Sequence, residues 1–186
     1  MRNLQAIILA AGEGTRMKSE RPKVLHPICG RPMIAYALDL AAASGIKQPI
    51  VVLGKGADQV KPALPKEARA VLQPARLGTG DAVAAAKKLL SGGAVLILYA
   101  DTPLLRRTTV QKLVETHFKT GATCTLLTAH LADPSGYGRI LRNENGQIAS
   151  VVEEAEANAA QRAIREINVG PMVCSTQALV EALAAA

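Results

Sequence analysis

Apolar residues in this chain are grouped in short runs, and most runs are followed by a segment with helical spacing. The runs predict strands over residues 6–11, 49–54, 68–73, 94–101 and 123–131. In the first two runs both faces are apolar, as in a strand buried on both sides. The intervening segments predict helices over residues 33–45, 57–64, 80–93 and 108–121. This alternation predicts an α/β fold with a mostly parallel sheet and helices on both faces.

The pattern changes after residue 130. Residues 136–153 predict two strands joined by the turn sequence NENG at 143–146, which indicates a β-hairpin. A helix-like link over 156–167, a strand over 168–174 and a helix over 177–186 complete the chain. We therefore expect a small β-hairpin lobe beside the main sheet.

Composition narrows the classes of function. The 186 residues suffice for one domain with a real core, and they include three Tyr, one Phe and no Trp. So few aromatics argue against a stacking platform for single-stranded nucleic acid. The net charge of +7 is not gathered into a basic block, and no apolar run reads as a membrane span. We expect neither a nucleic-acid nor a membrane partner.

Two further observations favour a cytoplasmic protein. No charged segment followed by an apolar one opens the chain, as a secretory leader would. Cys29, Cys124 and Cys174 stand far apart in sequence and show no metal-ligand spacing, so we expect buried free thiols. The three histidines are scattered, and we expect them to be structural.

A glycine-rich loop directly follows the first predicted strand. Gly12 and Gly14 allow the backbone to approach a ligand closely, and successive N–H groups in such a loop can hold phosphate oxygens. The loop fits neither the dinucleotide-binding nor the P-loop fingerprint. Arg16 and Lys23 add the cations that a phosphate needs, which favours phosphate binding over a plain strand-to-helix turn.

Asp101 ends the fourth predicted strand, in the sequence YADTPLL. A carboxylate in that position suits Mg²⁺ held together with substrate phosphates. The alternative is a helix N-cap or a turn with Pro103. Because parallel strands bind ligands beyond their carboxyl ends, Asp101, the glycine loop and Gln73 are expected to meet in one crevice.

Other polar residues have weaker local signals. Gln73 and the segment 77–82 carry amide and hydroxyl groups suited to a base edge, or form an ordinary helix start capped by Thr79 or Asp81. Glu153, Glu154 and Asn168 could hold sugar hydroxyls, although each alone reads more simply as a surface residue.

Taken together, the motifs resemble the sugar-1-phosphate nucleotidylyltransferases. The sequence LAAGEGTRMKSERPKVLHPICGRPM at 9–33 resembles the signature of that superfamily. Within it, LGTGDA, YADTPLL, GYGRI, VVEEAEA and EINVG follow in the order found in the N-terminal uridylyltransferase domain of the bacterial bifunctional GlmU family. The resemblance covers essentially the whole chain, and it implies a Rossmann-like nucleotidyltransferase fold with a sugar-binding hairpin lobe.

The resemblance implies three groups of site residues. The nucleotide would be bound by Leu9, Ala10, Ala11, Gly12, Gly14, Gln73, Gly78 and Thr79, with uracil read by the last three. The sugar would be bound by Tyr99, Ala100, Gly138, Glu153 and Asn168. The catalytic residues would be Arg16 and Lys23, which neutralise the triphosphate, and Asp101, which is also the expected Mg²⁺ ligand.

The implied reaction is a Mg²⁺-dependent transfer of UMP. N-acetylglucosamine-1-phosphate attacks the α-phosphorus of UTP, giving UDP-N-acetylglucosamine and pyrophosphate for cell-wall precursors. In that family the domain extends past residue 186 to an Asn that completes the metal site, and a β-helix acetyltransferase domain follows. The resemblance therefore predicts a fragment of a protein that also acetylates glucosamine-1-phosphate. We expect a homotrimeric parent and a fragment that could be monomeric.

Three positions depart from the family's pattern. Ala100 replaces a Gly, Val169 replaces a Thr, and Asp81 stands where many members have His. Two alternatives remain open on the sequence. One is a catalytically inactive nucleotide-binding fragment. The other is a related nucleotidylyltransferase with a different base or acceptor, such as the molybdopterin-guanylyl type.

Overall fold

The computed structural model describes residues 3–12, 14–75 and 78–185, and for Arg16 it describes the backbone alone. It divides the chain into two compact units, each of which is considered by itself. Unit 1 comprises residues 1–125 and 172–186, and unit 2 comprises residues 126–171. No described helix combines the length and the hydropathy that a membrane crossing requires.

Unit 1 is built on a parallel sheet. Its parallel strands follow the order β5 (Arg69–Leu72), β4 (Ile50–Leu53), β1 (Leu4–Ala10) and β6 (Ala94–Tyr99). The carboxyl-terminal half of β10 (Glu166–Ser175) then pairs antiparallel with β6, with Val173 opposite Leu96. All four parallel strands were predicted, and their carboxyl ends lie at one edge of the sheet.

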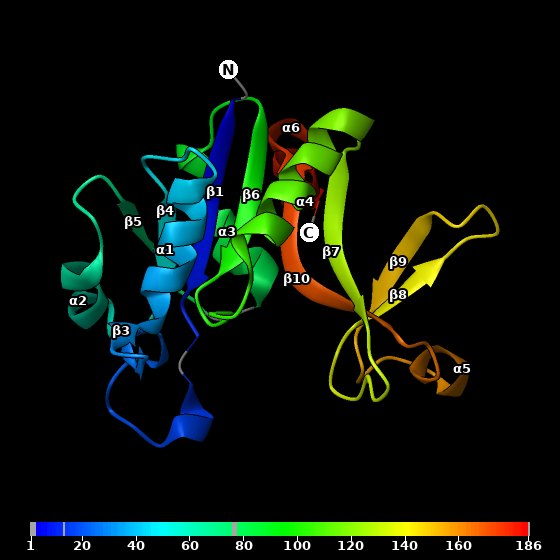
Figure 1. The fold of residues 1–186 in the computed structure, drawn as a ribbon, viewed down its shortest axis with the longest axis horizontal. Helices are drawn as coiled ribbons and strands as arrows, with labels where there is room; N and C mark the ends of the chain where they lie inside the picture. Colours follow the sequence, from blue (N-terminus) through cyan, green and yellow to red (C-terminus); the bar gives the residue numbers. More distant parts are fainter. Residues whose placement is uncertain (1–2, 13, 76–77, 186) are drawn as a thin grey trace. The chain divides into compact units, whose positions relative to one another are not determined.

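Helices cover both faces of this sheet, as predicted. In Figure 1, α1 (Met33–Ala43) and α4 (Arg107–Thr120) lie in front of the sheet, and α3 (Thr79–Ala85) and α6 (Thr176–Ala185) lie behind it. The rear face is a buried cluster in which Ile7, Val52 and Ile97 from the strands contact Val83 of α3. The two-residue alternation of a strand explains this division, because Ile8 and Val51 point to the opposite face and are also fully buried.

Shorter elements connect these strands and helices. They are the 3₁₀ turns η1 (Thr15–Met17), η2 (Lys23–Leu25), η3 (Lys61–Ala63) and η4 (Lys87–Leu89), the helix α2 (Ala57–Val60) and the hairpin strands β2 (Pro27–Ile28) and β3 (Arg31–Pro32). The apolar pattern of the sequence did not predict this hairpin. Its two turn residues, Cys29 and Gly30, both have positive φ, which is the geometry of a type I′ turn.

Unit 2 is a small antiparallel unit. Strand β8 (Arg139–Arg142) pairs with β9 (Ile148–Val152) through the predicted NENG turn, and with the first half of β10 through Ile167 and Arg139. The strand β7 (Cys124–His130) leads into this unit and pairs with β10. The helix expected over 156–167 is wrong in length: α5 covers only Ala159–Arg162, because β10 already begins at Glu166.

The expectation that all three cysteines are buried is also wrong. Cys29 and Cys124 are exposed, and only Cys174 is buried. Strand pairing brings the Sγ atoms of Cys124 and Cys174, 50 residues apart in sequence, to 3.1 Å from each other. The pKa of the Cys174 thiol is raised by its hydrogen bond to Cys124 and by burial. Sequence spacing carries no information on such a contact between strands.

An ion pair inside unit 2 makes its stability depend on pH. The guanidinium of Arg142 donates to both carboxylate oxygens of Glu166 at 2.8 and 2.7 Å, and the Glu166 side chain is only 9% exposed. These hydrogen bonds, with help from Thr128 and His130 and against the effect of burial, lower the pKa of Glu166 to about 2.

We therefore expect this pair to stabilise unit 2 at pH values above the ordinary Glu pKa of 4.5 and to lose that effect as the pH falls toward about 2. In urea unfolding at stepped pH, Glu166→Gln should reduce stability at pH 7 and flatten its fall below pH 4.5. Glu144→Gln, which changes an exposed carboxylate of the same unit, serves as the control. An unchanged acid slope in Glu166→Gln would contradict this assignment.

Candidate functional site

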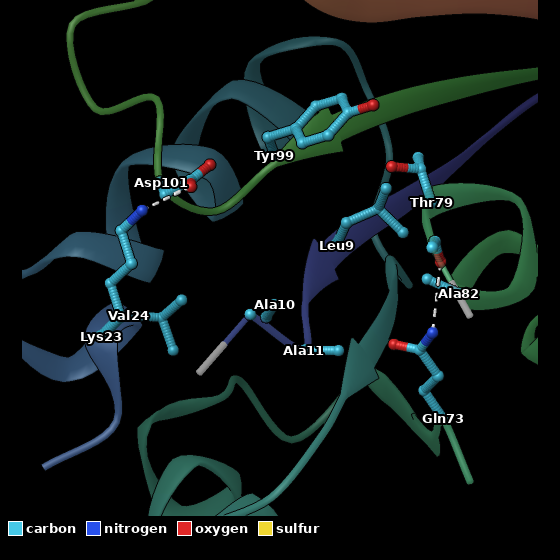
Figure 2. A pocket seen from close by; sticks show the side chains of 12 residues that line it. Leu9, Ala10, Ala11, Lys23, Val24, Gln73, Thr79, Ala82, Tyr99 and Asp101 are labelled. Carbon is cyan, nitrogen blue, oxygen red and sulfur yellow. Dashed lines mark hydrogen bonds and ion pairs between the residues drawn. The ribbon is translucent and has the colours of Figure 1, made fainter. Parts of the chain in front are cut away.

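A pocket of about 310 Å³ lies in unit 1 at the carboxyl ends of its parallel strands. Ten of its lining residues were singled out from the sequence: Leu9, Ala10, Ala11, Gly12, Lys23, Gln73, Gly78, Thr79, Tyr99 and Asp101. Figure 2 shows how they surround the pocket from separate segments of the chain. Val24 and Ala82 also line it and were not singled out. The pocket thus combines mostly apolar walls with a few polar groups.

One side of the pocket carries the charged groups. The Nζ atom of Lys23, in η2, lies 2.7 Å from an Oδ atom of Asp101, which follows β6. Their side chains are 29% and 40% exposed, so both remain within reach of a ligand. The alternative of Asp101 as a helix N-cap does not hold, because α4 begins at Arg107 with Arg106 in the N-cap position.

Gly14 supports the position of Lys23 without lining the pocket. Its φ of +63° lies in the left-handed region, and a Cβ there would come within 2.6 Å of the Cβ of Lys23. A side chain at this position would displace the lysine. The side chain of Arg16 and all of Glu13 lie outside the described part of the structure, so the predicted role of Arg16 stays a prediction.

The floor of the pocket is the end of β1. A further residue that the sequence analysis missed, Gly54 after β4, packs beneath it: a Cβ on Gly54 would lie 2.6 Å from the backbone oxygen of Ala11. The only signal in the sequence is a glycine that ends an apolar run. Ala100 is 1% exposed and does not line the pocket; its N–H donates to the oxygen of Leu9 and so joins β6 to β1.

The opposite side of the pocket holds the amide of Gln73. The Nε2 atom of Gln73 donates to the backbone oxygen of Gly78 at 3.2 Å and to an Oδ atom of Asp81 at 2.7 Å. Gly78, with φ +118°, is the N-cap of α3, and no side chain caps this helix. The alternative roles of Thr79 and Asp81 as helix caps are therefore excluded.

The three residues expected to bind sugar in unit 2 lie together. Gly138 accepts a hydrogen bond from the backbone N–H of Asn168 at 2.8 Å. A Cβ on Gly138 would come within 3.1 Å of an Oε atom of Glu153, so glycine allows this close approach. The side-chain oxygen of Asn168 accepts from the N–H of Gly170 at 3.0 Å, which closes a turn around Val169.

Comparison with known proteins places the chain in a family. Residues 6–186 match the family model described as the MobA-like NTP transferase domain. The chain belongs to the MobA-like NTP transferase family. Membership makes it a nucleotidyltransferase domain, and it explains why a glycine loop, a lysine and an aspartate meet at the carboxyl ends of the sheet.

Curated proteins that are similar to this chain carry the name bifunctional protein GlmU. The protein from Shouchella clausii is 45% identical over 181 residues, which are 96% of this chain and 40% of that protein. The protein from Pelotomaculum thermopropionicum is 48% identical over 183 residues, which are 97% of this chain and again 40% of the relative. The chain thus spans less than half the length of these relatives.

Solved structures confirm the fold. Apo UDP-glucose pyrophosphorylase superposes with a TM-score of 0.80 at 19% identity, covering 98% of this chain and 80% of that one. UDP-glucose pyrophosphorylase complexed with UDP-glucose gives a TM-score of 0.81 at 19% identity, covering 99% and 80%. The predicted Rossmann-like nucleotidyltransferase fold is therefore confirmed.

Proposed function

We propose that the pocket of unit 1 binds UTP and that the chain serves the transfer of UMP to N-acetylglucosamine-1-phosphate. The products are UDP-N-acetylglucosamine and pyrophosphate. The observation that carries this proposal is the convergence of the loop after β1, Lys23, Gln73 and Asp101 on one pocket. Membership of a nucleotidyltransferase family supports the reaction type, and relatives named bifunctional protein GlmU at 43–48% identity support the acceptor.

For this reaction the protein must position the two substrates and neutralise the charge that develops on the phosphates. An oxygen of the sugar phosphate forms a bond to the α-phosphorus of UTP, and the bond from that phosphorus to the oxygen leading to the β-phosphate breaks. Pyrophosphate leaves with the electron pair, so no covalent enzyme intermediate is required. The backbone of Ala10 to Gly12 would orient the phosphates, and the ammonium of Lys23 would offset the developing charge.

The residues present fit a magnesium ion. Mg²⁺ keeps several waters and is bound through one or two carboxylates together with substrate phosphates. Asp101 offers one partly exposed carboxylate to the pocket, and the described residues contain no cluster of three metal-ligating side chains that would suggest another ion. Asp101 would hold Mg²⁺ with UTP, and the ion would supply additional neutralisation of phosphate charge.

In unit 2 we propose that Gly138, Glu153 and Asn168 hold the sugar. Their proximity to one another supports this assignment, since the exposed carboxylate of Glu153 and the side-chain amide of Asn168 can both hydrogen-bond to sugar hydroxyls beside Gly138. Acetylation of glucosamine-1-phosphate, a trimeric assembly and a cytoplasmic location stay predictions.

Pyrophosphate release tests the proposal. We expect release by this chain only when UTP, N-acetylglucosamine-1-phosphate and Mg²⁺ are all present, and we expect it to be lost in Asp101→Ala. Asp39→Ala removes a carboxylate from a comparable pair, 2.8 Å from Arg31 on the exposed surface, and should leave release unchanged. Binding of UTP without release would instead favour the inactive nucleotide-binding alternative. Release of pyrophosphate from GTP would favour a nucleotidylyltransferase that is specific for another base.

A further inference from the structure

The side-chain amide of Gln73 can point in two ways, and its surroundings determine which one is adopted. A glutamine amide has an NH₂ group that donates and an oxygen that accepts, so rotating it by half a turn reverses what it offers to a ligand. The nitrogen of this amide contacts the backbone carbonyl of Gly78 and the carboxylate of Asp81. A carbonyl oxygen and a carboxylate only accept hydrogen bonds. The NH₂ group must therefore face them both.

The contact with Asp81 is the stronger of the two. The separation of 2.7 Å is shorter than the 3.2 Å to Gly78, and hydrogen bonds to a charged acceptor are roughly twice as strong as neutral ones. The carboxylate lies in the first turn of α3, and Gln73 directly follows β5, where its N–H continues the ladder to Leu53 at 2.8 Å. Both partners are thus held by regular structure.

Both hydrogens of the Gln73 amide are used by these contacts, and the oxygen is left on the pocket side. Figure 2 shows the Gln73 nitrogen on its dashed hydrogen bond and the oxygen on the other side, toward Ala11, which also lines the pocket. The pocket therefore presents an acceptor at this point and not a donor. Uracil has a ring N–H at position 3, which is a donor, whereas cytosine has an unprotonated acceptor nitrogen there.

We propose that Asp81 is a positioning residue that fixes the Gln73 amide with its oxygen toward the pocket, so that the site selects uracil over cytosine. The inference rests on the proposed function, since it assumes that a nucleotide base occupies this side of the pocket. Unpaired or opposed polar groups at a recognition site are costly, and a site built to accept one hydrogen bond discriminates strongly against a base that lacks the donor.

Calorimetric titration with UTP and CTP in the presence of Mg²⁺ tests this role. The wild-type chain should bind UTP more tightly than CTP. In Asp81→Asn the new amide both donates and accepts, so only the longer contact with Gly78 still favours the original orientation of the Gln73 amide, and we expect the ratio of the two dissociation constants to fall by about tenfold or more. Asp58→Asn, the same change in the first turn of α2, should leave the ratio unchanged.

The ratio separates positioning from a structural role. If Asp81 merely supported the loop, Asp81→Asn would weaken UTP and CTP equally, and the unchanged ratio would overturn the inference. A wild-type ratio near one would also overturn it, while leaving nucleotidyl transfer in place. Binding of neither nucleotide to the wild-type chain would instead overturn the proposed function, and the inference with it.

The inference can also be tested by changing the nucleotide instead of the protein, so that the result does not depend on the folding of a variant. UTP methylated at N3 cannot donate to the Gln73 oxygen, and we expect it to bind the wild-type chain at least about tenfold more weakly than UTP. UTP methylated at C5 keeps the N3–H and serves as the matched ligand. Equal affinity for the N3-methylated nucleotide and UTP would overturn the inference.

Discussion

Lys23→Met is expected to lower the rate of UMP transfer by about 10²-fold or more, the usual cost of removing one preorganised charge contact. The ammonium of Lys23 lines the pocket, and no other cation in the described part of its lining could replace it. The ion pair with Asp101 keeps the ammonium at the pocket before substrate arrives. Methionine retains much of the side-chain length, so the change removes charge more than volume. The rate of pyrophosphate release at saturating substrate measures this effect.

Lys61→Met is the matched control for this prediction. Lys61 forms a comparable ion pair, with its Nζ 3.0 Å from an Oδ atom of Asp58, but on the exposed surface of unit 1. It should leave the rate unchanged, because exposed pairs contribute little. A Lys23→Met chain that transfers UMP as fast as the Lys61→Met chain would show that the lysine has no catalytic role.

Glu154→Ala should destabilise unit 2 by about 2 kcal/mol, because it removes the carboxylate partner of a buried arginine. The Arg139 side chain is 2% exposed, and its guanidinium lies 2.6 Å from an oxygen of Glu154. Its Nε atom already has no hydrogen-bond partner among the described residues. The carbonyl oxygens of Tyr137 and Arg162 accept hydrogen bonds from Nη1 and Nη2, but neutral carbonyls do not neutralise the charge.

Hydrogen exchange of the β8 amides in Glu154→Ala measures this loss locally, which matters because a chain of two units need not unfold in one step. Glu156→Ala removes an exposed carboxylate two residues away and should change protection little. Equal protection in the two variants would mean that the guanidinium of Arg139 does not depend on Glu154. In the sequence Glu154 was a candidate for sugar binding, whereas the structure gives it this ion pair.

The parallel strands and the position of the pocket followed from the sequence, because both depend on regularities that act along the chain. Apolar runs located β1, β4 and β6, and because ligands bind beyond the carboxyl ends of parallel strands, Gln73 and Asp101 were predicted to lie at one edge of the sheet. The sequence could not indicate that Asp81 holds the Gln73 amide, since that depends on how α3 packs beside β5. The local pattern offered Asp81 only as one of two alternative helix caps, beside Thr79.

Most of the other features that the sequence did not predict arise where segments of the folded chain approach each other closely. Gly14 beneath Lys23 and Gly54 beneath Ala11 are spacing requirements of the folded backbone, and one sequence cannot show what a glycine would otherwise collide with. The short α5 reflects competition between a helical pattern and strand pairing in β10, which local propensity does not weigh. The contact between Cys124 and Cys174 has the same origin in strand pairing.

The measurement that tests the central claim most directly is a two-dimensional ¹H–¹⁵N NMR titration of this chain with UTP and Mg²⁺. If the pocket of unit 1 binds the nucleotide, the largest shifts will fall on the amides of its lining residues: Ala10, Ala11, Gly12, Gly78, Thr79 and Asp101. Unit 1 also has a separate pocket lined by Leu38, Ile46 and Glu67, among others. Shifts confined to that pocket would contradict the account, as would the absence of any shift at millimolar UTP.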